Sequence, residues 1–229
     1  TNNFNTLNPL YELNAISLSE GNLEGEGSNS SYRRIVGTQA VTSGKWYYEG
    51  RIIKTTVNNP TFGWVLTNPE DWDNYTQPGT GAHEAAVMAA ATGQTHVGKA
   101  YVNTNLSSSY TSTTAAGDIF GIAIDFDNLG FYIHKNGTYY NSGDPTSGSS
   151  KTGSLDASGL EANEYTPALG CQDSNSAAFL NFGQDGTFGG AITAGGNSDA
   201  NGIGNFKYAV PSGYLALCSK NLGRKRYAK

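Results

Sequence analysis

Few side chains in this sequence have the types and spacings that catalysis requires. The three histidines, His83, His96 and His134, stand neither in a metal-ligand spacing such as His-x-x-x-His nor beside a cysteine pair. Serine is plentiful, but no Gly-x-Ser-x-Gly elbow follows a candidate strand. We expect His134 to be a solvated strand residue, and a nucleophilic pair of Cys171 with His134 would form only through folding. The sequence therefore predicts a protein that is not an enzyme and has no catalytic residue, metal site or cofactor.

Two carboxylates invite a second interpretation. Asp125 and Asp127 lie two residues apart on a predicted strand, so they share a face at a separation that suits a glycosidase pair. Aspartate at a strand end more often accepts hydrogen bonds from turn amides, and we favour this framework role. Together with Asn128, the two aspartates could also suggest a calcium-binding site, but the later Gly and Glu of an EF-hand loop are missing. Calcium elsewhere in the loops stays open.

Candidate binding residues are aromatic. Trp72 and Tyr75 stand among acids and an amide in residues 70–75, the chemistry that stacks on sugar rings or anchors a protein contact. The alternative is a tryptophan folded back under a long loop. We predict partner binding first at these two residues and add four further candidates, although tyrosine on a strand face ordinarily packs: Tyr32, Arg33, Tyr101 and Tyr110.

Composition indicates one folded all-β domain. The 229 residues include 30 Gly, 14 Tyr and 9 Phe, a mixture typical of strands joined by tight turns. Only 14% are charged, and the net charge of −5 disfavours nucleic-acid binding. No apolar run is long enough for membrane insertion. We expect Cys171 and Cys218 to be buried free thiols, with the redox state undecided. Thr1 without a preceding Met fits either Met removal or a segment of a longer polypeptide.

Strand patterns position these residues. In residues 118–126 the alternation directs Phe120, Ile122, Ile124 and Phe126 to the core, and Asn136-Gly137 predicts a hairpin turn. We expect further strands at 45–53, 61–66, 96–102, 165–170 and 177–182. Residues 68–94, 142–164 and 185–205 are expected to be loops, the last offering little to a core, and residues 85–91 could form a short helix. No strand–helix alternation supports a doubly wound α/β fold.

Five segments in order resemble one known family. They are SGKWYYE at 43–49, GDIFGIAIDFD at 117–127, FYIHKNG at 131–137, YTPA at 165–168 and LNFGQ at 180–184. Together they resemble a SPRY domain, which implies an antiparallel, two-sheet bent β-sandwich of the jelly-roll, concanavalin-A-like kind. It would span residues 1–222, followed by a basic tail at 223–229. The resemblance also implies partner binding through loops at one end of the sandwich.

The flanks narrow the resemblance. Residues 3–10 and 211–222 are similar to SPRY-like modules of bacteriophage structural proteins. This implies a non-enzymatic module at the virion surface, in a tail fibre or a capsid decoration. Its partners would be other virion proteins or a host-surface protein or glycan, and it could form a homo-oligomer within an assembly. The alternatives are a carbohydrate-binding module, a cellular SPRY adaptor that recognises a peptide, and a sandwich glycosidase. The alternative location to the virion surface is extracellular or cytoplasmic.

Overall fold

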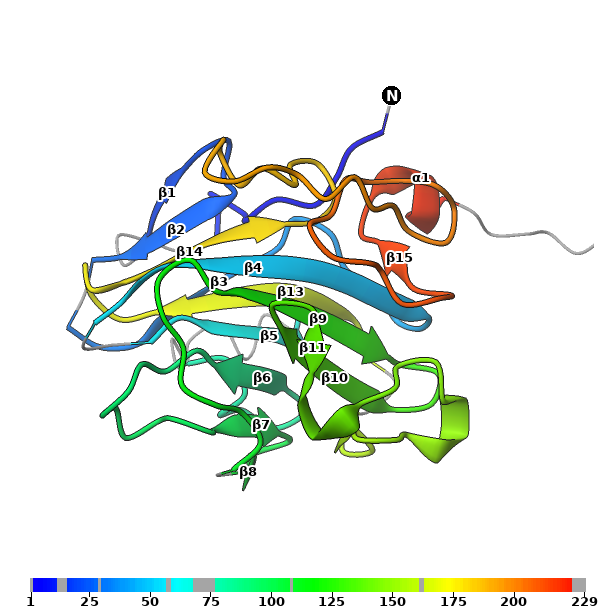
Figure 1. The fold of residues 1–229 in the computed structure, drawn as a ribbon, viewed down its shortest axis with the longest axis horizontal. Coiled ribbons are helices and arrows are strands. Elements are labelled where there is room, and N and C mark those ends of the chain that lie inside the picture. The colour runs from blue at the N-terminus through cyan, green and yellow to red at the C-terminus, as the bar shows by residue number, and fades with distance from the viewer. Residues whose placement is uncertain are drawn as a thin grey trace, which may run out of the picture.

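Two β-sheets with antiparallel pairing, apart from one short parallel contact, form the computed structural model (Figure 1). The structure describes residues 2–11, 16–28, 30–56, 59–67, 77–107, 109–160 and 163–223. Helix is limited to α1 (Ser219–Leu222) and the 3-10 turns η2 (Tyr140–Ser142) and η3 (Gly148–Ser150) in these ranges. The predicted all-β sandwich is thereby confirmed.

The large sheet has the order β1-β2-β14-β4-β9-β10-β11, with β12 beside β10 and β15 parallel to β4. Its strands are β1 (Ile16–Ser19), β2 (Glu24–Gly27), β4 (Lys45–Thr55), β9 (Ile119–Asp125), β10 (Gly130–Lys135), β11 (Thr138–Tyr139), β12 (Leu155–Asp156), β14 (Ser176–Asn181) and β15 (Leu215–Ala216).

The small sheet has the order β3-β13-β5-β6-β7-β8. Its strands are β3 (Arg33–Val36), β5 (Thr61–Leu66), β6 (Ala85–Met88), β7 (Ala100–Val102), β8 (Asn105–Ser107) and β13 (Tyr165–Cys171). Of the expected strand at residues 96–102, only the last three residues are β-structure.

The main core lies between the sheets as the alternation in β9 predicts. Phe120, Ile122 and Ile124 are fully buried there, and Phe126 packs partly buried against them. The phenyl rings of Phe120 and Phe62 lie 5.8 Å apart across the core. Burial of each such side chain stabilises the fold by roughly 1.5–3 kcal/mol.

The helix suggested for residues 85–91 is wrong, because β6 (Ala85–Met88) is a strand between β5 and β7. Every residue of β6 is buried, so packing overrides the helix propensity of alanine. β5 packs closely against β6 at Gly63, since a Cβ built on Gly63 would lie 2.7 Å from that of Ala86. The expected loop at 68–94 is interrupted by this strand.

A second cluster covers the outer face of the large sheet, which the alternation in β9 did not reveal. Tyr47, Ala123 and Tyr132 of the sheet pack there against Phe206 and Tyr214. These last two belong to residues 195–214, which we call the C-terminal strap. The preceding loop also contributes to the main core, because Phe188 is only 3% exposed. The expectation that residues 185–205 offer little to a core is therefore wrong.

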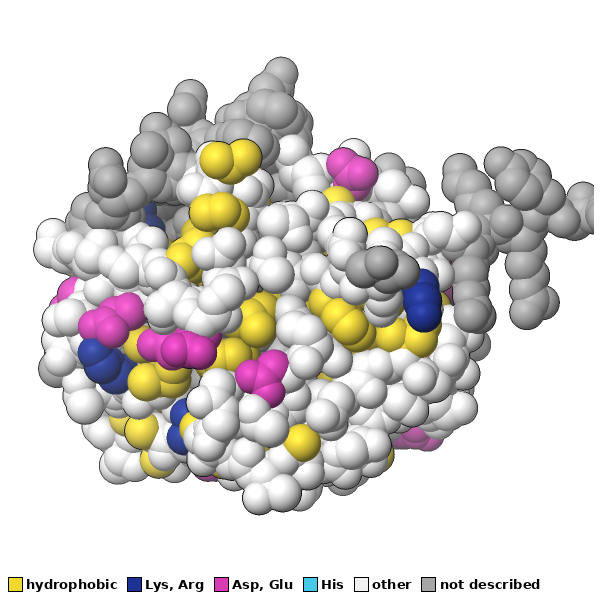
Figure 2. Space-filling model, turned by 90° about the horizontal axis from the view of Figure 1, so that it is seen from above, with side chains coloured by type: hydrophobic (Ala, Val, Ile, Leu, Met, Phe, Trp, Pro, Cys, Tyr) yellow, Lys and Arg dark blue, Asp and Glu magenta, His cyan; other side chains and the backbone are white. Residues whose placement is uncertain are grey.

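The two ends of the described chain pair with each other. Phe4 and Cys218 form an antiparallel bridge, the Asn5 amide donates to the Leu217 carbonyl at 2.9 Å, and Ser219 donates to Asn3 at 2.8 Å. Figure 1 places the N-terminus near α1, opposite the β7–β8 hairpin. Figure 2 views this side and shows few charged side chains among uncharged ones.

One row of residues crosses the large sheet beneath the strap. The registers pair Asn181 with Glu49, Glu49 with Gly121, Gly121 with His134 and His134 with Tyr139. Residues that are directly opposite in antiparallel strands share a face, so these side chains converge. Glycine is required in the middle, because a Cβ on Gly121 would lie 1.9 Å from His134 Nε2.

Glu49 is the centre of this row and attaches the strap to the sheet. Its Oε1 accepts hydrogen bonds from the Tyr208 amide at 2.8 Å and the Tyr47 hydroxyl at 3.1 Å. Its Oε2 accepts from the Lys207 amide at 2.9 Å and Asn181 Nδ2 at 3.3 Å. Burial raises the pKa of the Glu49 carboxyl, and these four donors partly offset that shift.

His134 continues the network and is not the solvated residue that the sequence predicts, because it is 1% exposed. Its Nδ1 accepts from the Gly137 amide at 3.2 Å, so Nε2 carries the proton toward the Tyr47 hydroxyl 2.8 Å away. Tyr47 in turn donates to Glu49. Burial lowers the pKa of His134 to about 3, so the ring is neutral in the folded protein at neutral pH.

Gly121→Ala should destabilise the domain by about 2–3 kcal/mol, because the new methyl group overlaps the buried imidazole. Urea unfolding measures this loss. The matched control repeats the substitution in a His134→Ala background, where the space is free and the further loss should be about 1 kcal/mol or less. Equal losses in both backgrounds would contradict the packing of His134 on Gly121.

Acid should weaken the fold through His134. Its folded pKa of about 3 lies below the unfolded value of 6.5, so the unfolded state takes up the proton first as the pH falls. Between pH 7 and pH 5 the wild type should lose about 2 kcal/mol more than His134→Gln. The raised pKa of Glu49 acts in the opposite direction but is present in both proteins. Parallel stability-versus-pH curves from urea unfolding would rule out the buried neutral ring.

Candidate binding groove at the open edge of the sandwich

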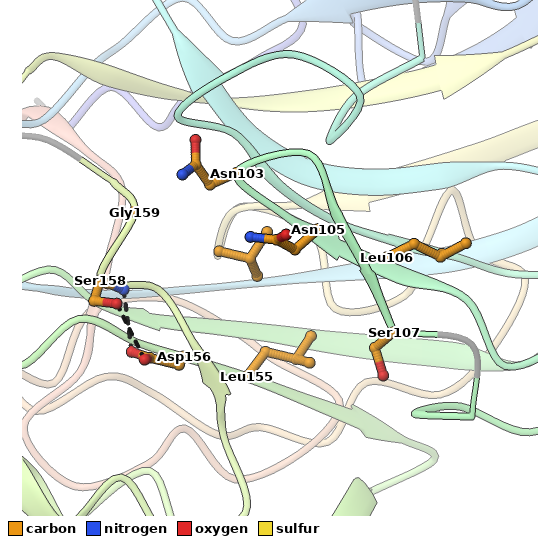
Figure 3. A pocket seen from close by; sticks show the side chains of 9 residues that line it. Asn103, Asn105, Leu106, Ser107, Leu155, Asp156, Ser158 and Gly159 are labelled. Carbon is orange, nitrogen blue, oxygen red and sulfur yellow. Dashed lines mark hydrogen bonds between the residues drawn. The ribbon is translucent and has the colours of Figure 1, made fainter.

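A hollow of about 600 Å³ opens at one edge of the sandwich, between the β7–β8 hairpin of the small sheet and β12 with its following loop (Figure 3). Its apolar lining comes from Val102 and Leu155, which also touch the main core, and from Leu106. Gly159 lines it as well, and the polar side chains are those of Asn103, Asn105, Ser107, Asp156 and Ser158. We call this hollow the edge groove.

The hairpin that forms one wall is held in a fixed geometry. Its loop consists of Asn103 and Thr104, with φ angles of 49° and 66°, which is the positive-φ pair of a type I′ turn. A β-branched residue rarely adopts such a φ, so the Thr104 backbone is strained. Strain of this kind persists only where surrounding structure enforces it.

Contacts at one end of the groove fix the first residue of this turn, Asn103. Asn103 Oδ1 accepts from the His83 amide at 2.9 Å, and His83 Nδ1 donates to the Gly159 carbonyl at 2.8 Å. A Cβ on Gly159 would lie 2.3 Å from Asn103 Nδ2, so only glycine allows this approach. The hairpin and the opposite loop are thus linked through His83 and lie in close contact.

The described lining carries little net charge. Among the described lining residues only Asp156 is ionisable, and Lys151 Nζ lies 2.6 Å from its carboxylate. The bond from Lys151 holds the pKa of Asp156 below its usual range. The amide and hydroxyl of Ser158 also donate to Asp156, at 3.1 and 3.0 Å (Figure 3). Such a lining can exchange hydrogen bonds with a ligand, and the lowered pKa of Asp156 makes its carboxylate a weak base for the neighbouring Ser158 hydroxyl.

Trp72 and Tyr75, the first predicted binding residues, lie outside the described residues. Beyond them, the described end of that loop crosses the outer face of the small sheet. Gln77 Nε2 donates to Thr61 Oγ1 at 2.8 Å, and a Cβ on Gly170 would lie 2.5 Å from Pro78 Cδ. Partner binding through Trp72 and Tyr75 stays a prediction.

Tyr32 and Arg33 lie at the β3 edge of the small sheet, far from the groove in strand order. The Tyr32 hydroxyl accepts from the Asn59 amide at 3.3 Å, and its ring meets the His96 ring edge-on at 6.3 Å. Arg33 donates to the Tyr32 carbonyl at 3.0 Å.

Tyr101 and Tyr110 are placed differently from each other. Tyr101 on β7 pairs with Leu106 of β8, so it adjoins the edge groove. Tyr110 is 4% exposed and donates to the Gly153 carbonyl at 3.1 Å, which makes it a packing residue in this structure. The structure therefore does not bring the four described candidates into one surface.

The sequence reasoning missed the groove residues themselves. One signal could have found the wall: residues 100–117, between Lys99 and Asp118, contain no charged residue and no proline. Such a stretch around a short hairpin is unusual for an edge, because natural edges are often protected by Lys or Pro. Nothing local, however, marks Asp156 and Ser158 as their neighbours.

The framework role of the two aspartates is confirmed. Asp125 Oδ1 accepts from the amides of Asp127 and Asn128 at 3.0 and 2.9 Å, and Lys45 lies 2.9 Å from Oδ2. Asp127 accepts from the Gly44 amide at 2.8 Å. Burial alone would raise the pKa of Asp125, but the bonds from Lys45 and Asn128 lower it. A glycosidase acid requires the opposite shift.

Both cysteines are buried and free, as predicted. Burial raises the pKa of the Cys171 thiol to about 12, which leaves it protonated and poorly nucleophilic. Cys171 lies in the small sheet and His134 in the large one. Their hydrogen bonds go elsewhere, from Cys171 to the Gly25 carbonyl and from His134 to Tyr47 and Gly137.

Among the described residues, no group of three or more His, Cys, Asp or Glu side chains is arranged to hold a metal ion. The described part of the chain also has no helix with the length and apolar character needed to cross a membrane.

Comparison with known proteins identifies the fold. No protein-family model matches the chain, and no curated protein matches it. Among solved structures, the SPRY domain of human HERC1 is 14% identical with a TM-score of 0.57, covering 76% of this chain and 96% of that one. The PSpry domain of TRIM65 is 13% identical with a TM-score of 0.55, covering 77% and 91%. The chain therefore has the fold of SPRY domains.

Proposed function

We propose that this domain is a non-enzymatic interaction module that holds a segment of a partner protein in the edge groove. The observation that carries the proposal is an open hollow of about 600 Å³ whose two walls are linked through His83 and which is lined by amides, hydroxyls and apolar side chains. Pockets of this size with a few oriented polar groups are the usual sites of ligand binding. The resemblance to SPRY domains, which implies partner binding, supports the proposal.

The other broad faces offer less. The strap covers the outer face of the large sheet, where Phe206 and Tyr214 are fully buried. Residues 77–84 cross the outer face of the small sheet, where Glu84 forms a buried ion pair with Arg34. Glu84 also accepts hydrogen bonds from the amides of Gly79 and Gly81. Both coverings are fixed by buried polar contacts, which leaves the edge for a partner.

Within this proposal, the partner is another virion protein or a host-surface protein. The similarity of residues 3–10 and 211–222 to phage SPRY-like modules supports that role. These two segments pair with each other on the side away from the β7–β8 hairpin (Figure 1), so attachment there would leave the groove free. Mass spectrometry of purified particles tests the virion role, and absence of the chain from them would remove it.

The carbohydrate alternative has weaker support from the groove. Amides and hydroxyls suit sugar hydroxyls, but no aromatic ring lines the hollow within the described residues. Stacking on an aromatic ring is the usual apolar component of sugar recognition. A glycan array on the same protein separates the two ligand classes.

Filling the groove should abolish partner binding. Panning a display library of random 12-residue peptides on the immobilised domain should yield clones that Ser158→Trp weakens at least tenfold, because the indole occupies the hollow. The control is Ser149→Trp, at an exposed serine of η3 that does not line the groove. Both variants should stay within about 0.5 kcal/mol of the wild type in urea unfolding.

Three results would count against the groove: no clones, clones indifferent to Ser158→Trp, or clones weakened equally by Ser149→Trp. Binding of glycans but not of peptides would replace the protein partner by a carbohydrate.

A further inference from the structure

We infer that the partner segment enters the edge groove as an added β-strand, paired with the backbone of Leu106 in β8. This inference rests on the proposed function and specifies how the partner is held and which chemistry it has.

The edge of β8 is open. β8 is the last strand of the small sheet, and among the described strands it pairs with β7 alone. Within the described part of the chain, its backbone makes no hydrogen bond beyond this pairing. The opposite edge is covered instead, since the Asn8 amide donates to the Val36 carbonyl at 2.8 Å and Leu7 bridges to Gly37. An unpaired edge next to a groove is the geometry used in strand addition.

The register of the hairpin identifies the available backbone groups. Val102 and Asn105 flank the two-residue turn, so they form its hydrogen-bonded closing pair. The next pair, Tyr101 and Leu106, is therefore the non-hydrogen-bonded one. The N–H and C=O of Leu106 consequently point away from β7 toward the open edge. Leu106 is 47% exposed and is one of the few large apolar residues that are exposed in the described part of the chain.

The edge lacks two usual protections against pairing, charged residues and proline. Lysine, proline and bulges commonly block an exposed strand, but residues 100–117 contain neither a charge nor a proline. The strand is only three residues long, which limits pairing to a few backbone hydrogen bonds. Most of the affinity must then come from side chains in the groove.

Alternation along the added strand defines the partner. Figure 3 shows Asn105 and Leu106 directed to opposite sides of β8. Side chains of the partner on the Asn105 side would enter the groove and meet amides and hydroxyls, while those on the other side would meet Leu106 and Tyr101. Asp156 is already paired with Lys151, so the described lining has no net charge that calls for an ionic partner. The occupant is an extended segment that alternates uncharged polar and apolar residues.

The test uses a synthetic peptide taken from the display selection. Leu106→Pro removes the N–H and should weaken binding at least tenfold, whereas the matched Leu106→Val keeps the backbone and an apolar side chain and should stay within threefold. Because proline could disturb the hairpin, two measurements use the wild-type domain. Replacing single peptide amides by esters should cost about fivefold at the position that donates to Leu106. Hydrogen exchange of the Leu106 amide should slow at least tenfold on binding.

The outcomes separate this inference from the proposed function. If Ser158→Trp abolishes binding but no ester matters and the Leu106 amide exchanges unchanged, strand addition is wrong while the groove stands. If binding ignores Ser158→Trp, both are wrong.

Discussion

A carboxylate buried at the centre of a sheet imposes the arrangement of the surrounding structure. Glu49 is fully buried, and burying an ionised group without compensation costs several kcal/mol. Its four hydrogen bonds come from β4 itself, from β14 and from two consecutive strap amides, those of Lys207 and Tyr208. The strap therefore has a single satisfactory position on the sheet. The aromatic cluster around Tyr47 and Phe206 is sealed as a consequence.

The chain His134–Tyr47–Glu49 has the order of a catalytic proton relay, but its surroundings favour a structural role. Each member is buried, and the lowered pKa of His134 keeps the ring neutral while it donates to Tyr47. The polar residues of the SPRY-like motifs behave similarly. Asp125, Asn136 and Asn181 each accept hydrogen bonds from backbone amides in turns or at strand starts. The motifs thus specify the framework and not the binding surface.

Local sequence pattern was sufficient to predict burial where the residues of one strand alternate between core and surface. It failed where segments distant in sequence pack together. The alternation of β9 predicted the buried row Phe120, Ile122 and Ile124, and Asn136-Gly137 predicted the β10–β11 turn. The prediction that His134 is solvated was wrong, because Tyr208 of the strap, some 70 residues later along the chain, packs against its ring. The groove was missed because its two walls, Asn105 and Asp156, are far apart in sequence. A window of a few residues reveals neither the contact of the strap with His134 nor the position of Asn105 opposite Asp156.

The covering of both outer faces determines how this domain can recognise anything. The strap closes one face and residues 77–84 cross the other, so deep contact is available at the edge and in the loops. Only 14% of the residues are charged, and the one carboxylate in the described lining of the groove is paired, so long-range electrostatic steering contributes little there. Recognition at the edge must then rely on hydrogen-bond geometry and shape at close range. A hairpin held rigid by Asn103, His83 and Gly159 suits that task, because a wall that is already ordered loses little entropy on binding.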